Sequence, residues 1–201
     1  MKTTLKKIIL HGEESTKLLQ RITTQDIYTC QQPKLAALCN ANGRVLVTFW
    51  VQYLEDAIHL WADISVIPIL LSQLRFYDPF CQLGFHLANE TVYATEACSF
   101  STEPSNNPLN WALFLIQKGI ITLSQNTSGK YTPHMLNLDK LDAISLTKGC
   151  FIGYEVIART HTRGKTKRRL TITSSDTPPP DALNTAQVEN GHLSLVISSL
   201  I

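Results

Sequence analysis

Residues 131–170 read YTPHMLNLDKLDAISLTKGCFIGYEVIARTHTRGKTKRRL and hold the most chemically informative side chains of this 201-residue chain. Within them Lys148, Gly149 and Cys150 follow one another, and Gly153 comes soon after. A neighbouring cation lowers the pKa of a thiol and favours the thiolate, the form that attacks and that binds metals. The two glycines let the backbone turn tightly or approach a ligand closely. We therefore predict that Cys150 is a working thiol whose pKa is lowered by Lys148.

A helix after the second glycine would bring two charged side chains together. If residues 154–160 are helical, Glu155 and Arg159 stand four positions apart on one face and can pair beside the thiol. The same spacing fits a second interpretation, in which Cys150 is a buried residue in a glycine-rich turn. His161 is the nearest candidate base, and a cysteine without a catalytic histidine is weak evidence for a covalent nucleophile. The spacing alone leaves both interpretations open.

A basic run follows. The chain carries +2 overall, but no acid occurs between Glu155 and Asp176. Such a run is either a solvated loop or a site for an anion such as phosphate, polyglutamate or RNA. Direct nucleic-acid binding is the least expected of these, because no stacking aromatics are interleaved with the cations. The six basic residues of the run are Arg159, Arg163, Lys165, Lys167, Arg168 and Arg169.

The segment resembles the signature of the YgfZ family of folate-binding proteins, within the superfamily of the glycine cleavage T-protein (GcvT). The family pattern is Lys-Gly-Cys-Tyr/Phe-x-Gly-Gln-Glu, with an arginine four residues on. This chain has it from Lys148 to Glu155 with Arg159, apart from Tyr154 at the Gln position. Further matches are Thr132-Pro133, Asn137 to Asp139, Gly164, Lys167-Arg168, Leu19-Gln20, Thr24 to Asp26 and Asn40 to Arg44.

This resemblance implies an α+β fold. We expect a GcvT/YgfZ-like folate-binding core over residues 1–170 and a reduced C-terminal β-barrel remnant, a short β appendage, over residues 171–201. The implied function is that of a folate-dependent accessory factor in iron–sulfur cluster assembly or repair, which affects tRNA-modifying enzymes. Tetrahydrofolate is the implied cofactor and iron–sulfur client proteins are the implied partners. The implied role is that of an accessory factor more than that of an enzyme, and the sequence leaves enzymatic activity open.

The resemblance also implies a set of site residues. Cys150 would be the working thiol, with Lys148 beside it, and at most a transient metal ligand, because one cysteine cannot hold a cluster. The implied folate-binding residues are Asn137, Asp139, Gly149, Gly153, Tyr154, Glu155 and Arg159. For Asn137 and Asp139, capping of a turn is an equally good interpretation.

The chain departs from its relatives at positions that bear on folate chemistry. Tyr154 stands where the family has Gln, and Met135 stands where many relatives have a Glu that grips the pterin. Val47 and Thr48 take the place of an acidic pair of the T-protein, so its aminomethyl transfer is not expected here. Two alternatives to the accessory-factor function stay open. One is a folate-dependent aminomethyl or one-carbon transferase, and the other is a non-catalytic binding module that has lost folate binding.

Composition excludes several classes. With 44% hydrophobic and 17% charged residues, the chain is too apolar for intrinsic disorder. Its five cysteines form no CxxC motif, which argues against a disulfide framework and a zinc site. No apolar run reaches the roughly 18 residues of a membrane helix, and the N-terminus lacks the features of a signal peptide. We expect a cytoplasmic protein without membrane contact.

Local patterns predict the elements. Apolar spacing predicts a helix over residues 13–22, with Ser15 as a possible cap, and Asn42-Gly43 predicts a hairpin turn. A second hairpin is predicted to turn at Asn190-Gly191. The other predicted helices cover 65–76 and a stretch from Pro108 to Gly119, and the predicted strands cover 35–39, 45–54, 57–61, 91–97 and 120–123.

Overall fold

A computed structural model describes residues 1–80, 83–104, 110–164 and 166–200. The predicted helix start at Pro108, Cys81 and the basic Lys165 lie outside the described residues. The described residues form a mixed helix and sheet fold, in agreement with the α+β class expected from the sequence.

The largest element is a five-stranded antiparallel sheet with the strand order β2-β3-β4-β1-β5. The predicted turn at Asn42-Gly43 joins β2 to β3, and Gly43 has a positive φ of 66° that suits a glycine there. The strands are β1 (Leu5–His11), β2 (Lys34–Cys39), β3 (Val45–Tyr53), β4 (Ala57–Asp63) and β5 (Gly84–Leu87).

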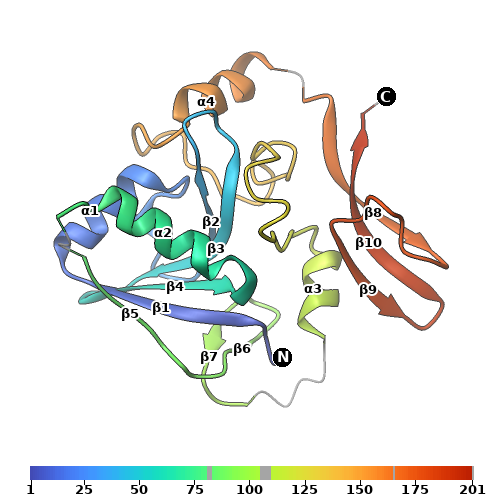
Figure 1. Cartoon of the computed structure of the whole chain (residues 1–201), viewed down its shortest axis with the longest axis horizontal. Helices are drawn as coiled ribbons and strands as arrows, with labels where there is room; N and C mark the ends of the chain where they lie inside the picture. Colours follow the sequence, from blue (N-terminus) through green and yellow to red (C-terminus); the bar gives the residue numbers. More distant parts are fainter. Residues whose placement is uncertain (81–82, 105–109, 165, 201) are drawn as a thin grey trace.

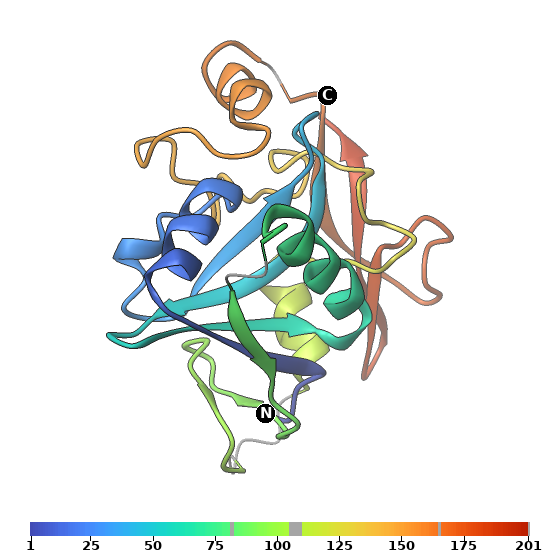
Figure 2. The same cartoon turned by 60° about the vertical axis from the view of Figure 1, so that its left-hand side comes forward.

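Two helices cover one face of this sheet. Helices α1 (Glu13–Ile22) and α2 (Ile67–Tyr77) lie on one side, while α3 (Trp111–Gln117) and a smaller sheet lie on the other (Figures 1 and 2). Alternate residues of a strand face opposite sides. The side toward α1 and α2 therefore takes the fully buried apolar residues Ile8, Leu10, Val47, Phe49, Val51, Ile58 and Leu60.

The smaller sheet is C-terminal, open and antiparallel, with the order β8-β10-β9. It packs against α3, and its strands are β8 (Arg168–Ser175), β9 (Asn184–Val188) and β10 (Gly191–Ser199). The predicted turn at Asn190-Gly191 is confirmed between β9 and β10. Strand β8 crosses residue 170, the expected domain boundary, so the division of the chain at that point stays a prediction.

The remaining elements are short, apart from one helix. They are the 3-10 turns η1 (Ile27–Thr29) and η2 (Ile64–Val66), the paired strands β6 (Tyr93–Ala94) and β7 (Phe100–Ser101), and helix α4 (Tyr154–Arg163). Figure 1 shows α4 above the tip of the β2-β3 hairpin, and the yellow part of the chain after α3 between the two sheets. The part that leads into α4 reaches the end of α1, where Ser145 and Lys148 bond to Thr24 and Gln20.

Two local predictions are wrong. Residues 120–123 form no strand, because their backbone groups bond to side chains: Asn184 bonds both the N–H and the carbonyl of Thr122. Ser15 does not cap α1. It lies inside the helix and donates to the carbonyl of His11, and Gly12 is the residue that precedes the helix.

Candidate functional site

The signature segment Lys148–Arg159 is fixed to the main sheet at Gly153. This residue precedes α4 with a φ of 81°. A β-carbon built on it would lie 2.7 Å from the carbonyl oxygen of Asn40 and 2.9 Å from the Cα of Gly43. The close backbone approach expected at this glycine is therefore made to the tip of the β2-β3 hairpin. Two stretches of the resemblance, the hairpin and the signature, meet at this contact.

Cys150 is exposed on the loop that leads to α4. Gly149 before it has a φ of 101°, and a β-carbon there would meet nothing within 4 Å. Two other cysteines differ from it: Cys30 and Cys39 are buried, and burial raises their pKa to about 11 and about 12. The interpretation of Cys150 as a buried core residue is thus wrong, and its sulfur is accessible to reagents and partners.

The hydrogen bond and the ring contact of Lys148 are made with α1 and Phe151, and neither of them is with Cys150. Its Nζ donates a hydrogen bond to the carbonyl of Gln20 in α1 and lies 5.3 Å from the centre of the Phe151 ring. Burial lowers the pKa of Lys148 to about 8, although Asp26 and Cys30 act to raise it. Its ammonium ties the signature loop to the end of α1, and its electrostatic partners are Asp26 and Cys30.

The side chains on the first turns of α4 play separate roles. Tyr154 donates from its hydroxyl to the carbonyl of Leu146 at 3.2 Å and packs its ring edge-on against Phe151. The helix predicted over residues 154–160 is confirmed, but Glu155 and Arg159 are exposed on it and do not occur among the ion pairs of the described residues. The predicted pairing of these two side chains is wrong.

Asn137 and Asp139 hold Arg169. Both carboxylate oxygens of Asp139 accept from the guanidinium at 2.8 Å, and Asn137 Oδ1 accepts at 3.1 Å. Asn137, in the left-handed region with a φ of 57°, also donates to the carbonyl of Leu170 at 2.8 Å. Burial raises the pKa of Asp139, but Arg169, together with His134 and a backbone hydrogen bond, lowers it, and the net pKa falls below its usual value. These contacts attach the 131–143 loop to β8.

Two adjoining hollows lie beside this ion pair, and we call them together the basic groove. They share Thr160, Thr166 and Lys167, and neither is lined by Cys150. The first encloses about 610 Å³ and is also lined by His134, Asp139, His161, Gly164, Arg169 and Leu200. The second encloses about 360 Å³ and is also lined by Arg44, Thr132, Met135 and Arg168. Four cations and one carboxylate line the groove, so an anion is attracted to it.

Sequence reasoning missed His134. Its side chain is buried with 2% exposure, and neither ring nitrogen has a hydrogen-bond partner among the described residues. The ring of His161 lies 5.8 Å away, centre to centre. The one signal for His134 in the sequence is its position directly after Thr132-Pro133, within residues 131–170. The sequence shows the basic run, but local spacing does not indicate that Arg169 of this run pairs with Asp139.

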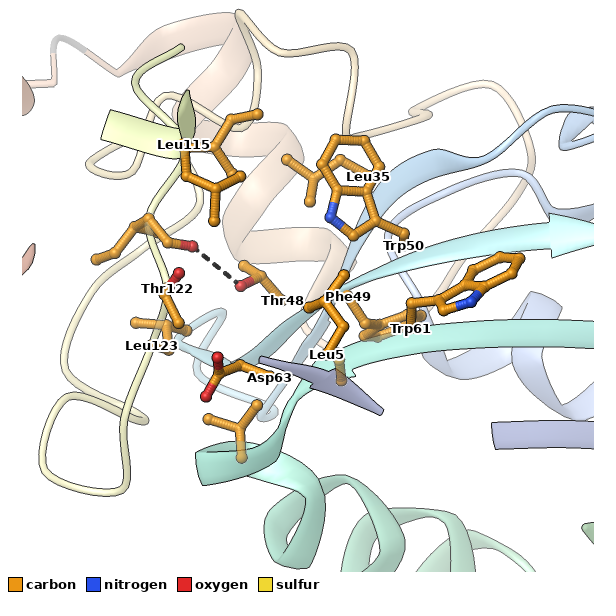
Figure 3. Close-up of a pocket in the computed structure, with 14 residues that line it drawn as sticks. Leu5, Leu35, Thr48, Phe49, Trp50, Trp61, Asp63, Leu115, Thr122 and Leu123 are labelled. Carbon is orange, nitrogen blue, oxygen red and sulfur yellow. Dashed lines mark hydrogen bonds between the residues drawn. The ribbon is translucent and has the colours of Figure 1, made fainter. Parts of the chain in front are cut away.

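A third hollow includes Thr48, one of the two positions that the sequence resemblance matched to an acidic pair. Thr48 lines it with Trp50, Trp61 and Asp63, and its hydroxyl donates to the carbonyl of Ile121 at 3.4 Å (Figure 3). Its volume is about 20 Å³, which is room for about one water molecule. Val47 points to the other face of the sheet and is fully buried. A pterin does not fit in this hollow.

The described residues contain neither a cluster of metal ligands nor a membrane-spanning helix. Across residues 1–80, 83–104, 110–164 and 166–200, no cluster of three or more His, Cys, Asp or Glu side chains is placed to hold a metal ion. In the same ranges, no helix has the length and apolarity to span a bilayer.

Known proteins give matches in sequence. A scan against models of protein families gives no match. The chain is 44% identical over 206 residues to the tRNA-modifying protein YgfZ of Buchnera aphidicola subsp. Acyrthosiphon pisum, covering 75% of this chain and 65% of that protein. It is 27% identical over 227 residues to the tRNA-modifying protein YgfZ of Colwellia psychrerythraea, covering 86% of this chain and 70% of that protein.

A solved structure matches the fold. The glycine cleavage system aminomethyltransferase T from Bartonella henselae superimposes with a TM-score of 0.69 over 98% of this chain and 76% of that chain. At 10% sequence identity this likeness concerns the fold, and it includes the small open C-terminal sheet of this chain within the matched length.

Proposed function

We propose, from the premise that this chain is a YgfZ/GcvT-like protein, that it is an accessory factor for iron–sulfur enzymes, including enzymes that modify tRNA. In this proposal it works in the cytoplasm, with Cys150 as its thiol and tetrahydrofolate as its ligand. The names of the relatives support the link to tRNA modification. The link to iron–sulfur clusters rests on the signature resemblance.

The observation that carries the proposal is the placement of Cys150. Its thiol is exposed on a loop whose two ends are held, at Lys148 by α1 and at Gly153 by the hairpin tip. A thiol presented in this way can meet a large partner, because it needs no cavity of its own. One exposed cysteine suits transient ligation of an iron atom or exchange with a partner's sulfur, and it does not suit a resident cluster.

The fit of tetrahydrofolate differs between the hollows. The one beside Thr48 holds about one water, so we assign no folate to it. The basic groove has the volume, and Arg44, Lys167 and Arg168 would pair with the carboxylates of the glutamate tail. When bound, tetrahydrofolate supplies a carrier for one-carbon units. Of the predicted folate-binding residues, only Asp139 lines this groove.

The closed hollow also favours a second candidate function. A binding module that has lost folate binding would have a filled centre such as this one, with Trp50 and Trp61 against Leu115. The one-carbon transferase receives no such support, because Thr48 and Val47 offer no carboxylate for general acid–base catalysis. Titration of the full chain with tetrahydrofolate separates the candidates: micromolar binding supports the first, and no binding at millimolar ligand supports the second.

The proposed function is tested in cells that lack the native protein. Thiolated tRNA and the activity of an iron–sulfur enzyme are measured with and without this chain, together with an enzyme that has no cluster. We expect the chain to restore the first two and to leave the third unchanged. A chain that is expressed and folded, yet restores neither, contradicts the proposal.

A further inference from the structure

His134 has unused hydrogen-bonding capacity beside a hollow. Buried polar side chains nearly always have a partner, and one without a partner costs free energy. His134 is 2% exposed and is one of the residues that line the hollow of about 610 Å³, and its imidazole bonds to no described residue through either nitrogen. Its own backbone carbonyl is engaged, since it accepts from Arg169 at 2.9 Å. The ring therefore stands at the wall of the hollow with one donor and one acceptor that no described residue uses.

The charges around this hollow favour a negative ligand. Asp139 comes from the 131–143 loop and is neutralised by Arg169, whose guanidinium it holds in place. Lys167 comes from the segment before β8 and has no ion-pair partner among the described residues. His161 faces the ring from α4. Acids other than Asp139 do not occur among the residues that line either half of the groove.

We propose that His134, Lys167 and Arg169 form a site for an oxyanion, the carboxylate or phosphate end of a small ligand. An oxyanion accepts hydrogen bonds from an imidazole N–H, an ammonium and a guanidinium, and charge-assisted bonds of this kind are the strong ones. A cation would meet Lys167 and Arg169 at like charge. This site includes His134, a residue that belongs neither to the signature segment nor to the basic run.

Proton uptake should accompany binding. Burial lowers the pKa of His134; Asp139 acts to raise it, and His161 and Arg169 lower it further. The ring is therefore neutral in the free protein at neutral pH. A bound oxyanion stabilises the imidazolium, so it raises this pKa, and binding becomes tighter as the pH falls.

The test measures sulfate binding to the full chain by calorimetry at about pH 8 and about pH 6. Sulfate keeps its charge in this range, so a pH dependence reports on the protein. We expect about tenfold tighter binding at the lower pH, and a loss of most of that dependence in His134→Gln. His161→Gln, on the facing ring, should keep it. We expect His134→Phe to fold, because the replaced ring makes no hydrogen bond within the described chain, and to lose sulfate binding by at least about tenfold.

The source of the oxyanion is identified by displacement. AMP and tetrahydrofolate each compete with bound sulfate, and the tighter competitor identifies a phosphate or a carboxylate. Displacement by AMP alone would remove folate from the proposed function and leave this site in place. Absence of sulfate binding to the wild-type chain, equal binding to His134→Phe, or a failure of both competitors would overturn the inference.

Discussion

The Cα of Gly43 lies 2.9 Å from the position that a β-carbon would occupy on Gly153. These two glycines are far apart in the sequence, one at the tip of the β2-β3 hairpin and the other at the start of α4. Val156, on the first turn of α4, lies close to the hairpin in return: its Cβ is 3.2 Å from a β-carbon built on Gly43. The hairpin therefore sets the position of the loop that presents Cys150.

A comparison of two glycine variants tests this contact. Gly153→Ala adds a backbone clash to the strain of a positive φ, whereas Gly149→Ala adds the strain alone. We expect a loss in the free energy of unfolding of about 1 to 2 kcal/mol for Gly149→Ala and of about 3 kcal/mol or more for Gly153→Ala. Urea unfolding measures both. Equal losses would show that the hairpin does not constrain Gly153.

The Asp139–Arg169 pair should stabilise the groove. Asp139→Asn leaves the guanidinium without its charged partner, and we expect a loss of about 2 to 4 kcal/mol in the free energy of unfolding. Because the pKa of Asp139 is lowered on folding, its contribution is present above the unfolded pKa and is lost as the pH falls through the folded value. The difference in the free energy of unfolding between wild type and Asp139→Asn should therefore become smaller as the pH falls, which urea unfolding at several pH values measures.

An exposed pair provides the control. Asp142, whose side chain is 88% exposed, approaches Lys34 at 4.0 Å. Exposed pairs contribute less than about 1 kcal/mol, so Asp142→Asn should unfold almost as the wild type does. If Asp139→Asn proves equally mild, the 131–143 loop is held to β8 by other contacts.

Lys148 should make stability rise with pH in the alkaline range. Its pKa is about 8 in the folded chain against 10.5 in the unfolded one, mainly because burial disfavours the charge. Between these values the unfolded chain binds the extra proton, so the free energy of unfolding increases with pH. We expect wild type to gain stability relative to Lys148→Met from about pH 8 to about pH 10. If the difference in the free energy of unfolding between wild type and Lys148→Met stays constant over this pH range, the ammonium of Lys148 is solvated in the folded chain.

Cysteine reactivity should single out Cys150. Cys30, Cys39 and Cys98 have pKa values raised by burial to between about 11 and about 12. With a chromogenic disulfide reagent at neutral pH, Cys150→Ser should remove one rapidly reacting equivalent, and Cys98→Ser should not. A Cys81→Ser variant accounts for the cysteine outside the described residues. A rapid phase of unchanged size when Cys150→Ser is added to Cys81→Ser contradicts the exposed placement of Cys150.

Local signals in the sequence predicted elements well and side-chain partners poorly. Helix α1 and the turns at Asn42-Gly43 and Asn190-Gly191 follow from apolar spacing and turn chemistry, which act within a few residues. Lys148 and Cys150 are neighbours in sequence, yet the ammonium bonds Gln20 and not the thiol. The pairing of Asp139 with Arg169 depends on how the 131–143 loop meets β8, and no local pattern encodes that meeting.

Complementation tests whether the Cys150 thiol does the work of this protein. Cells that lack the native protein receive wild type, Cys150→Ser or the matched control Cys98→Ser at equal protein levels. Thiolated tRNA and iron–sulfur enzyme activity are then measured. We predict restoration by wild type and Cys98→Ser and failure of Cys150→Ser. Full restoration by Cys150→Ser would show that the protein works without the Cys150 thiol.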